Sequence, residues 1–404
     1  MTAAKRRSPG EGGAYPYRTA AGERWRFKCV VTRPDGTRQP VNRRGFLTKA
    51  DALRAMREAL SASDKGGFAD PSRQPFAAYL TDWLEGLPMR LAPSTVASYR
   101  KNIRLHIEPY PIARLPLAQV TPTRLDALYQ ALRKSGRQDG QGDALKARTV
   151  LYIHTIISAA LRDAVEAEML PRNPAAKAHP PTAKQAQAPE MHPWSAEQLR
   201  AFLGWAREHS DLYAAWYVLA KTGMRRGELL ALRWRDIDLD AGTIRVRRSV
   251  GVVKTFGEPE EIDEGPTKTN TPRVIDVAPR TVAVLRAWKR ARGAMALQLA
   301  RDDALAFGNL EGEFRHPETF SKTFVKSVAR CQRDLGEEAP PRIRLHDLRH
   351  TCASILLSAG EPITTVSRML GHKSVNITLG IYSHVLPGDG KRTAARLDEL
   401  VGEA

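Results

Sequence analysis

The 404-residue sequence has very little cysteine and no long apolar run. Its three cysteines, Cys29, Cys331 and Cys352, are too few and too scattered for a disulfide framework or a zinc knuckle, which suits a reducing cytoplasm. No apolar stretch approaches the ~18 residues of a membrane-spanning helix, and no apolar signal core follows the basic residues near the N-terminus. We therefore expect a soluble, cytoplasmic protein.

Acidic residues are the scarcer charge, with 44 Asp and Glu against 63 Lys and Arg and a formal net charge of +19. Such an excess favours polyanionic partners, nucleic acid first, over a merely solvated basic surface. The length allows two or three domains, each with its own core.

The N-terminal 70 residues predict a small sheet with one helix behind it. Residues 1–20 are rich in Gly, Ala and charge, and we expect them to lack regular structure. A strict alternation then begins, typical of a half-buried strand, with one apolar face (Trp25, Phe27, Cys29, Val31) and one basic face (Arg24, Arg26, Lys28). A second strand at Val41–Phe46 and a capping box at 48–51 follow. The basic face suits a DNA groove, and a dimerisation module with a solvated face is the alternative.

Residues 75–181 predict four amphipathic helices that form a compact bundle, the last one stopped by Pro171 and Pro174. Five residues on or beside polar faces could track DNA phosphates or could be ordinary solvated charges: Arg100, Lys101, Arg104, Arg148 and His154. The first three are the predicted DNA contacts. The Ala-, Pro- and Gln-rich stretch at 175–191 lacks periodicity, and we interpret it as extended, with the interdomain linker itself at 182–192.

The last domain, 193–404, mixes helices with short strands. An apolar helix ends at Gly223 and a new one starts at Arg225, a position where backbone N–H groups favour an anion and where Glu228 could brace the guanidinium. Strands are expected at 243–250 and 273–277, separated by the acidic insertion GEPEEIDEG, of unknown purpose, and by a polar turn that carries Lys268. Helices are expected at 280–305 and 318–333. The chain as a whole is predicted to be multidomain, mainly α with small β-sheets.

The stretch from Leu345 to Tyr382 concentrates hydrogen-bonding and cationic groups on three short apolar helical segments, the first two closed by Gly360 and Gly371. These groups are His346, Arg349, His350, His372 and Tyr382, and we expect the tyrosine to be exposed. A guanidinium matches phosphate oxygens bidentately, imidazoles can donate to the same oxygens, and a phenol can attack phosphorus. The set predicts phosphoryl transfer to tyrosine.

Other interpretations of these residues are weaker. His346 and His350 have the i, i+4 spacing of a zinc pair, but Arg349 on the same turn repels a cation and the glutamate of a zinc protease motif is missing. We expect no metal and no other cofactor, and we expect His350 to be structural. Arg225, Arg349 and Lys268 could be ordinary surface charges. The amphipathic tail at 391–404 could pack on its own subunit or on a neighbouring one.

Four motifs carry a family resemblance: TGMRRGELLALRWRDID, PTKTNTPRVIDV, LHDLRHTCAS and LGHKSVNITLGIYSH. In this order they closely resemble the tyrosine recombinase family, specifically the integrases of phages and integrative elements. The resemblance spans the last domain and extends more weakly to the helical region and the N-terminal sheet. It implies an arm-type DNA-binding domain at 1–70, a core-binding domain at 75–181 and a mixed α+β catalytic domain at 193–404.

The resemblance also implies residue roles and partners. Arg225 would be the first catalytic arginine, Lys268 the hairpin lysine, His346 and Arg349 the His-x-x-Arg pair, His372 the second histidine and Tyr382 the nucleophile that forms a covalent 3′-phosphotyrosine. His346 is then the candidate base for the phenol, and Lys268 would protonate the departing 5′-oxygen. The implied partners are double-stranded DNA attachment sites and three further copies in a tetramer; whether a host DNA-bending protein or an excision factor takes part stays open. The alternatives are a type IB topoisomerase-like enzyme and a catalytically silent DNA-binding regulator.

Overall fold

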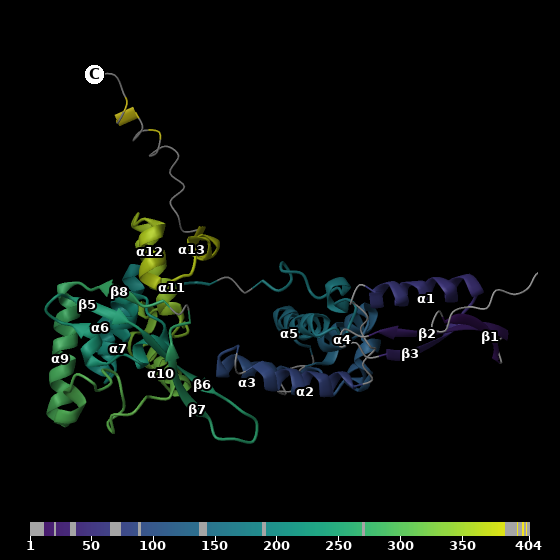
Figure 1. Ribbon diagram of the computed structural model, residues 1–404. Helices are drawn as coiled ribbons and strands as arrows, with labels where there is room; N and C mark the ends of the chain where they lie inside the picture. Colours follow the sequence, from purple (N-terminus) through teal and green to yellow (C-terminus); the bar gives the residue numbers. More distant parts are fainter. Residues whose placement is uncertain are drawn as a thin grey trace, which may run out of the picture. The chain divides into compact units, whose positions relative to one another are not determined.

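The structure is a computed structural model that divides into two compact units, Met1–Ala188 and Pro189–Ala404 (Figure 1). It describes residues 12–19, 22–32, 38–64, 74–87, 90–136, 144–187, 191–268, 271–383, 394, 398, 399 and 401. Within these ranges no helix is long and apolar enough to cross a membrane. The predicted C-terminal tail lies almost entirely outside them.

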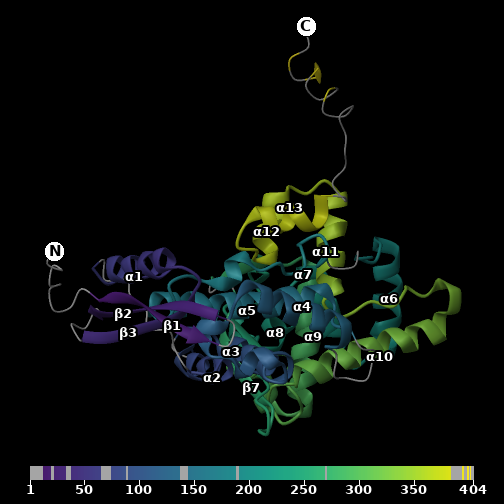
Figure 2. The ribbon, with the colours of Figure 1, turned by 90° about the vertical axis from the view of Figure 1, so that its right-hand side faces the viewer.

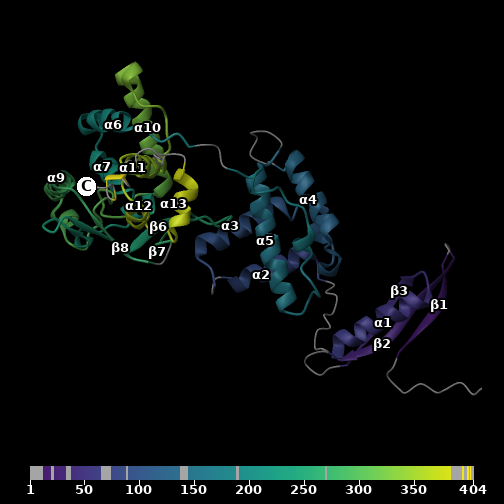
Figure 3. The same cartoon turned by 90° about the horizontal axis from the view of Figure 1, so that it is seen from above.

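A three-stranded antiparallel sheet with one helix against it forms the start of the first unit (Figure 3). It consists of β1 (Gly13–Thr19), β2 (Gly22–Thr32), β3 (Arg38–Phe46) and α1 (Lys49–Asp64). The predicted alternation is confirmed, since Phe27, Cys29 and Val31 on β2 are buried. The expectation for residues 1–20 was wrong at β1. That segment contains glycine and proline and lacks an alternating pattern, and it becomes a strand by main-chain pairing with β2.

The four predicted helices of the next region are confirmed: α2 (Phe76–Gly86), α3 (Pro93–His106), α4 (Pro122–Ser135) and α5 (Ala147–Glu166). They share one apolar core, in which α5 buries Ile153, Ile156 and Ile157. The stretch that was expected to be extended from residue 175 is not extended at its start. Asn173 caps a short 3-10 turn, Pro174–Lys177, and Ala175 in that turn is buried in this core.

The second unit is organised around a large core of aromatic and aliphatic side chains. Trp194, Phe202, Trp216 and Phe324 contact one another there. Its elements are α6 (Ala196–His209), α7 (Tyr213–Thr222), α8 (Arg226–Leu230), β4 (Ile237–Asp238), β5 (Thr243–Val246), β6 (Arg248–Val253), β7 (Glu261–Pro266), β8 (Arg273–Asp276), α9 (Pro279–Met295), α10 (Pro317–Leu335), α11 (Asp347–Ser358), α12 (Ile363–Leu370) and α13 (Val375–Tyr382).

The strand predicted at 243–250 is two strands, which belong to different sheets. β5 pairs with β4 and β8, whereas β6 pairs with β7. The acidic insertion therefore supplies β7. Its Glu264 accepts two hydrogen bonds from Arg233, at 2.5 and 2.9 Å, and forms an ion pair with Arg248 at 3.1 Å. These contacts tie the insertion to the body of the unit.

Helices α11, α12 and α13 pack together at the end of the described chain (Figure 2). The predicted breaks are confirmed: Gly360 follows α11, and Gly371 ends α12 with a left-handed φ of 69°. A small core joins the three helices and consists of Ala353, Leu357, Val366, Leu370 and Tyr382.

Candidate active site

The turn between α7 and α8 brings the first arginine to the site. Gly223 ends α7 at a φ of 60°, and its carbonyl oxygen accepts a hydrogen bond from Arg349 Nη1 at 2.7 Å. A Cβ atom at Gly223 would lie 2.6 Å from Leu370 Cδ2, so the turn requires glycine. Arg225 follows as the N-cap of α8.

A buried carboxylate joins two arginines from distant parts of the sequence. Glu228 binds Arg225 through Nη1 at 2.8 Å and Arg273 through a bidentate pair at 3.0 and 2.6 Å. The predicted bracing of Arg225 by Glu228 is thus confirmed. Burial alone would raise the pKa of Glu228, but Arg273 and Arg225 outweigh it and hold that pKa below its usual value. The carboxylate is therefore charged and fixes both guanidinium groups.

Arg273 was not singled out from the sequence. It stands at the first position of β8, where an arginine reads as an ordinary strand-edge charge. Its Nε donates to the Met369 carbonyl oxygen at 2.9 Å, so it also ties β8 to the end of α12. The signal that existed was its position inside the motif PTKTNTPRVIDV.

Arg349 is 3% exposed, and only some of its hydrogen-bond donors have a partner among the described residues. Its Nη1 binds Gly223, whereas its Nη2 is buried and has no hydrogen-bond partner among the residues that the structure describes. Burial and then Arg225 lower its pKa to about 10, so it is still cationic at neutral pH. A buried cationic donor without a partner is costly, and an anion placed against Nη2 would remove that cost.

Two of the histidines share this electrostatic environment. His346 is the N-cap of α11, and His372 lies after α12, where its Nδ1 is 2.7 Å from Thr378 Oγ1. The pKa of each is lowered to about 4, and burial is the largest cause. The charges of His350 and Arg349 lower the pKa of His346 further. Arg349 and Arg225 do the same for His372. Both rings are therefore neutral at pH 7 until an anion binds beside them.

Tyr382 is not exposed, contrary to expectation. Its side chain is 1% exposed and packs between α11 and α12, while Val375, Ile377 and Leu379 of the same helix face outward. Burial raises its pKa, and Arg349 offsets part of that effect. The core beneath α13 takes up the aromatic ring of Tyr382. The helix is therefore oriented with these three aliphatic side chains toward solvent, which its apolar pattern does not predict.

The partner of the phenol is His350, whose Nδ1 lies 2.6 Å from Tyr382 Oη. His346, the base expected from the sequence, instead stacks edge-to-face on His350, with ring centroids 5.1 Å apart. His350 and Tyr382 are 32 positions apart on different helices, a contact that no local pattern reveals.

Lys268 is exposed in the connection between β7 and β8. No hydrogen bond or ion pair within the described ranges joins it to the other five predicted residues. The structure thus brings together Arg225, His346, Arg349, His372 and Tyr382, and leaves Lys268 apart.

The predicted DNA-contacting residues lie in the first unit. Arg24, Arg26 and Lys28 alternate with the buried residues of β2, and Tyr17, Tyr15 and Gly13 stand opposite them on β1. On α3, Arg100 and Lys101 are exposed and Arg104 is partly buried.

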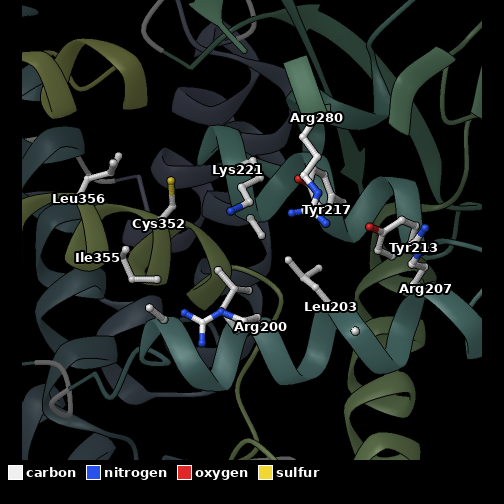
Figure 4. Close-up of a pocket in the computed structure, with 14 residues that line it drawn as sticks. Arg200, Leu203, Arg207, Tyr213, Tyr217, Lys221, Arg280, Cys352, Ile355 and Leu356 are labelled. Atoms are coloured by element: carbon white, nitrogen blue, oxygen red, sulfur yellow. The ribbon is translucent and has the colours of Figure 1, made fainter. Parts of the chain in front are cut away.

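A cavity of about 430 Å³ lies between α6, α7 and α11 (Figure 4). Arg200, Lys221 and Arg280 line it together with Tyr217 and Leu203, and none of the six predicted residues does. Over the described part of the chain, no group of three or more His, Cys, Asp or Glu side chains is arranged to hold a metal ion.

Comparison with known proteins shows which proteins the chain is similar to. Residues 194–388 match the model of the phage integrase family. The chain is 27% identical over 331 residues to the ICEBs1 integrase of Bacillus subtilis, covering 81% of this chain and 83% of the relative. It is 23% identical over 364 residues to a XerC-like tyrosine recombinase of Caldanaerobacter subterraneus, covering 87% and 90%.

Two solved structures share the fold. The Tn1549 transposon integrase in complex with circular intermediate DNA superposes with a TM-score of 0.64 at 18% identity, covering 81% of this chain and 100% of that chain. A lambda integrase dimer bound to a COC′ core site has a TM-score of 0.54 at 18% identity, covering 96% and 98%. Residues 194–388 of this chain therefore match the phage integrase family, and more than four fifths of the chain is similar to an integrase and to a tyrosine recombinase.

Proposed function

We propose that this protein is a site-specific DNA recombinase, an integrase that integrates and excises a mobile element through a covalent 3′-phosphotyrosine intermediate. The observation that carries the proposal is Nη2 of Arg349, which is buried and has no hydrogen-bond partner among the residues that the structure describes; the charge of this guanidinium lowers the pKa of the buried Tyr382. A phosphodiester placed against that nitrogen would meet a cationic donor and the phenol together.

The roles of the residues follow from their chemistry. Tyr382 Oη attacks the DNA phosphorus, and the bond to the 5′-oxygen breaks. Arg349 and Arg225 stabilise the charge that builds on the non-bridging oxygens, and Glu228 fixes Arg225 in place. His346 and His372 add hydrogen bonds to the same oxygens. The two fixed arginines supply the positive charge that a metal ion supplies in other phosphoryl transfers.

Lys268 protonates the departing 5′-oxygen, which it reaches from the connection between β7 and β8. The phosphotyrosine then stores the energy of the cleaved bond. The 5′-hydroxyl of a partner strand attacks it and releases Tyr382, so rejoining needs no ATP. Two such exchanges complete a recombination event.

The partners are double-stranded attachment sites, on which four copies assemble, with a host bending protein or an excision factor as accessory. Residues 1–70 bind arm-type sites through the basic face of β2, residues 75–181 bind the core site, and residues 193–404 carry the chemistry. The Tn1549 and lambda integrases were solved with DNA, the lambda integrase at a core site, which supports DNA as the partner. The protein works in the bacterial cytoplasm, at the nucleoid.

The test uses DNA that flanks the gene for this protein. Candidate crossover sites are made as nicked duplexes that trap the cleaved intermediate, mixed with protein in EDTA, and separated on a denaturing gel. We expect a covalent adduct with the wild type and with Tyr213→Phe, a matched tyrosine of α7 outside the site. Tyr382→Phe should bind DNA and give no adduct.

Two other results would change the assignment. Bound DNA without an adduct indicates a silent DNA-binding regulator and contradicts the proposal. An adduct with any sequence, together with relaxation of supercoiled plasmid and no strand exchange, indicates a type IB topoisomerase-like enzyme.

A further inference from the structure

His350 makes the one hydrogen bond that the described residues offer to the hydroxyl of Tyr382. The distance from Nδ1 to Oη is 2.6 Å, which is short for a bond between a ring nitrogen and a hydroxyl. Both side chains are buried, with 9% of His350 and 1% of Tyr382 exposed. The contact is therefore shielded from water, and neither group can exchange its partner for solvent.

The surroundings favour the uncharged form of both groups. Burial lowers the pKa of His350 and raises that of Tyr382, so the neutral pair is the stable form. The tautomer with the ring proton on Nε2 lets the phenol donate and Nδ1 accept, and the inference below requires that tautomer.

Six charged or titratable groups among the described residues contact His350 or interact with it electrostatically. On α11 these groups are Asp347 and Arg349, with His346 at the N-cap of the helix and Arg344 before it; Tyr382 comes from α13, and His372 lies between α12 and α13. Asp347 raises the pKa of His350, whereas Arg349 and Arg344 lower it. The carboxylate favours an imidazolium once a proton arrives.

We propose that His350 is the catalytic residue that accepts the phenolic proton of Tyr382 during cleavage and returns it during rejoining. The inference rests on the proposed function, since it assigns a step of that reaction. It differs from the expectation that His346 is the base, because His346 contacts His350 and not the phenol.

The step balances in both directions. During cleavage the Oη–H bond breaks, its proton moves to His350 Nδ1, and the Oη–P bond forms while the P–O5′ bond breaks; Lys268 gives the 5′-oxygen its proton. During rejoining the 5′-hydroxyl loses its proton to Lys268, and the imidazolium of His350 protonates the departing phenolate. Each group is thus reset after one cleavage and one rejoining.

The first variant keeps the shape of the contact and removes its basicity. In His350→Asn the amide oxygen takes the place of Nδ1 and accepts the same hydrogen bond, but it cannot take up a proton. We expect adduct formation with nicked DNA to slow at least ~100-fold, the usual contribution of a positioned base, with DNA binding unchanged. The matched control is His209→Asn, a histidine of α6 whose Nδ1 bonds the Trp205 carbonyl at 2.9 Å; it should react at the wild-type rate.

Chemical rescue separates proton transfer from support of the fold. His350→Ala leaves a space of the size of an imidazole ring, and added imidazole should restore adduct formation, with substituted imidazoles of higher pKa restoring it further. A purely structural histidine would show neither effect. Rescue of His346→Ala with none of His350→Ala would assign the base to His346 and overturn the inference.

A measurement on the unaltered chain covers the case in which these variants fail to fold. With histidine labelled with nitrogen-15, the Nδ1 of His350 should give the signal of an unprotonated ring nitrogen at pH 7.5. A protonated Nδ1 would overturn the inference, because the phenol would then accept the hydrogen bond.

The outcomes distinguish the two proposals. If the wild type forms the adduct and His350→Asn forms it equally fast, the role of His350 is overturned and the recombinase assignment stays intact. The same holds if His350→Asn is slow but imidazole does not rescue His350→Ala. No adduct from the wild type on sites that it binds overturns the proposed function and this inference with it.

Discussion

At the scale of single residues, Glu228 holds the site together. It is 1% exposed and neutralises two guanidinium groups that would otherwise face each other across the site. Glu228→Gln leaves both arginines without a charged partner in a buried place, so we expect it to lower the free energy of unfolding by about 3 kcal/mol. Urea denaturation followed by tryptophan fluorescence measures this, because five of the seven tryptophans lie in the second unit.

A matched control is Glu260→Gln, which removes an exposed carboxylate paired with Lys254. Exposed pairs contribute little, and we expect no measurable change in the denaturation midpoint. Equal midpoints for the two variants would mean that the cluster around Glu228 does not depend on its charge.

At the scale of elements, the left-handed residue that ends α12 also shapes the site. A Cβ atom at Gly371 would lie 2.9 Å from Arg273 Nη1, whereas at Gly360, which also has a positive φ, it would meet nothing within 4 Å. Gly360→Ala should cost only the backbone strain of about 1–2 kcal/mol. Gly371→Ala should cost more and should slow adduct formation, because Arg273 must leave Glu228. Equal losses of stability in the two variants, measured in urea, would rule out the contact with Arg273.

At the scale of the whole molecule, folding is linked to proton binding. The pKa of His372 is about 4 in the folded chain against an ordinary value of 6.5. The unfolded chain therefore binds more protons between these values, and stability is lost as the pH falls from about 6.5 towards 4. We expect His372→Asn to lose less stability than the wild type between pH 7.5 and pH 5.5, by ~1 kcal/mol after allowance for partial exposure. Parallel loss in both proteins, measured by urea titration, would contradict the shift.

The helices could be predicted from the sequence because their signals are local. Proline at the first position of α3 and α4 and the capping box before α6 mark where these helices begin. Strands β1 and β7 and the break between β5 and β6 could not be predicted, since the pairing partners lie across turns and the local patterns are weak. A strand of the acidic insertion becomes visible only when Arg233 and Arg248 are placed beside Glu264.

The candidate site divides in the same way. Its predicted residues follow from motifs, and the structure brings five of the six together. Their partners do not follow from motifs. Arg273 meets Glu228 over 45 positions, and His350 meets Tyr382 over 32. The burial of Tyr382 runs against the local pattern because the core beneath α13 accepts the ring and leaves Ile377 and Leu379 outside.

The connection that carries Lys268 is short, and ion pairs fix the strands at both of its ends. Glu264 is paired on β7, and Arg273 is paired on β8. Lys268 lies five positions before Arg273, so its Cα atom stays within roughly 18 Å of that anchor. An ammonium group on so short a connection has an effective concentration on the order of tens of millimolar. A free amine in solution would need a comparable concentration to compete with it, so the lysine needs no fixed resting place to be available at each cleavage.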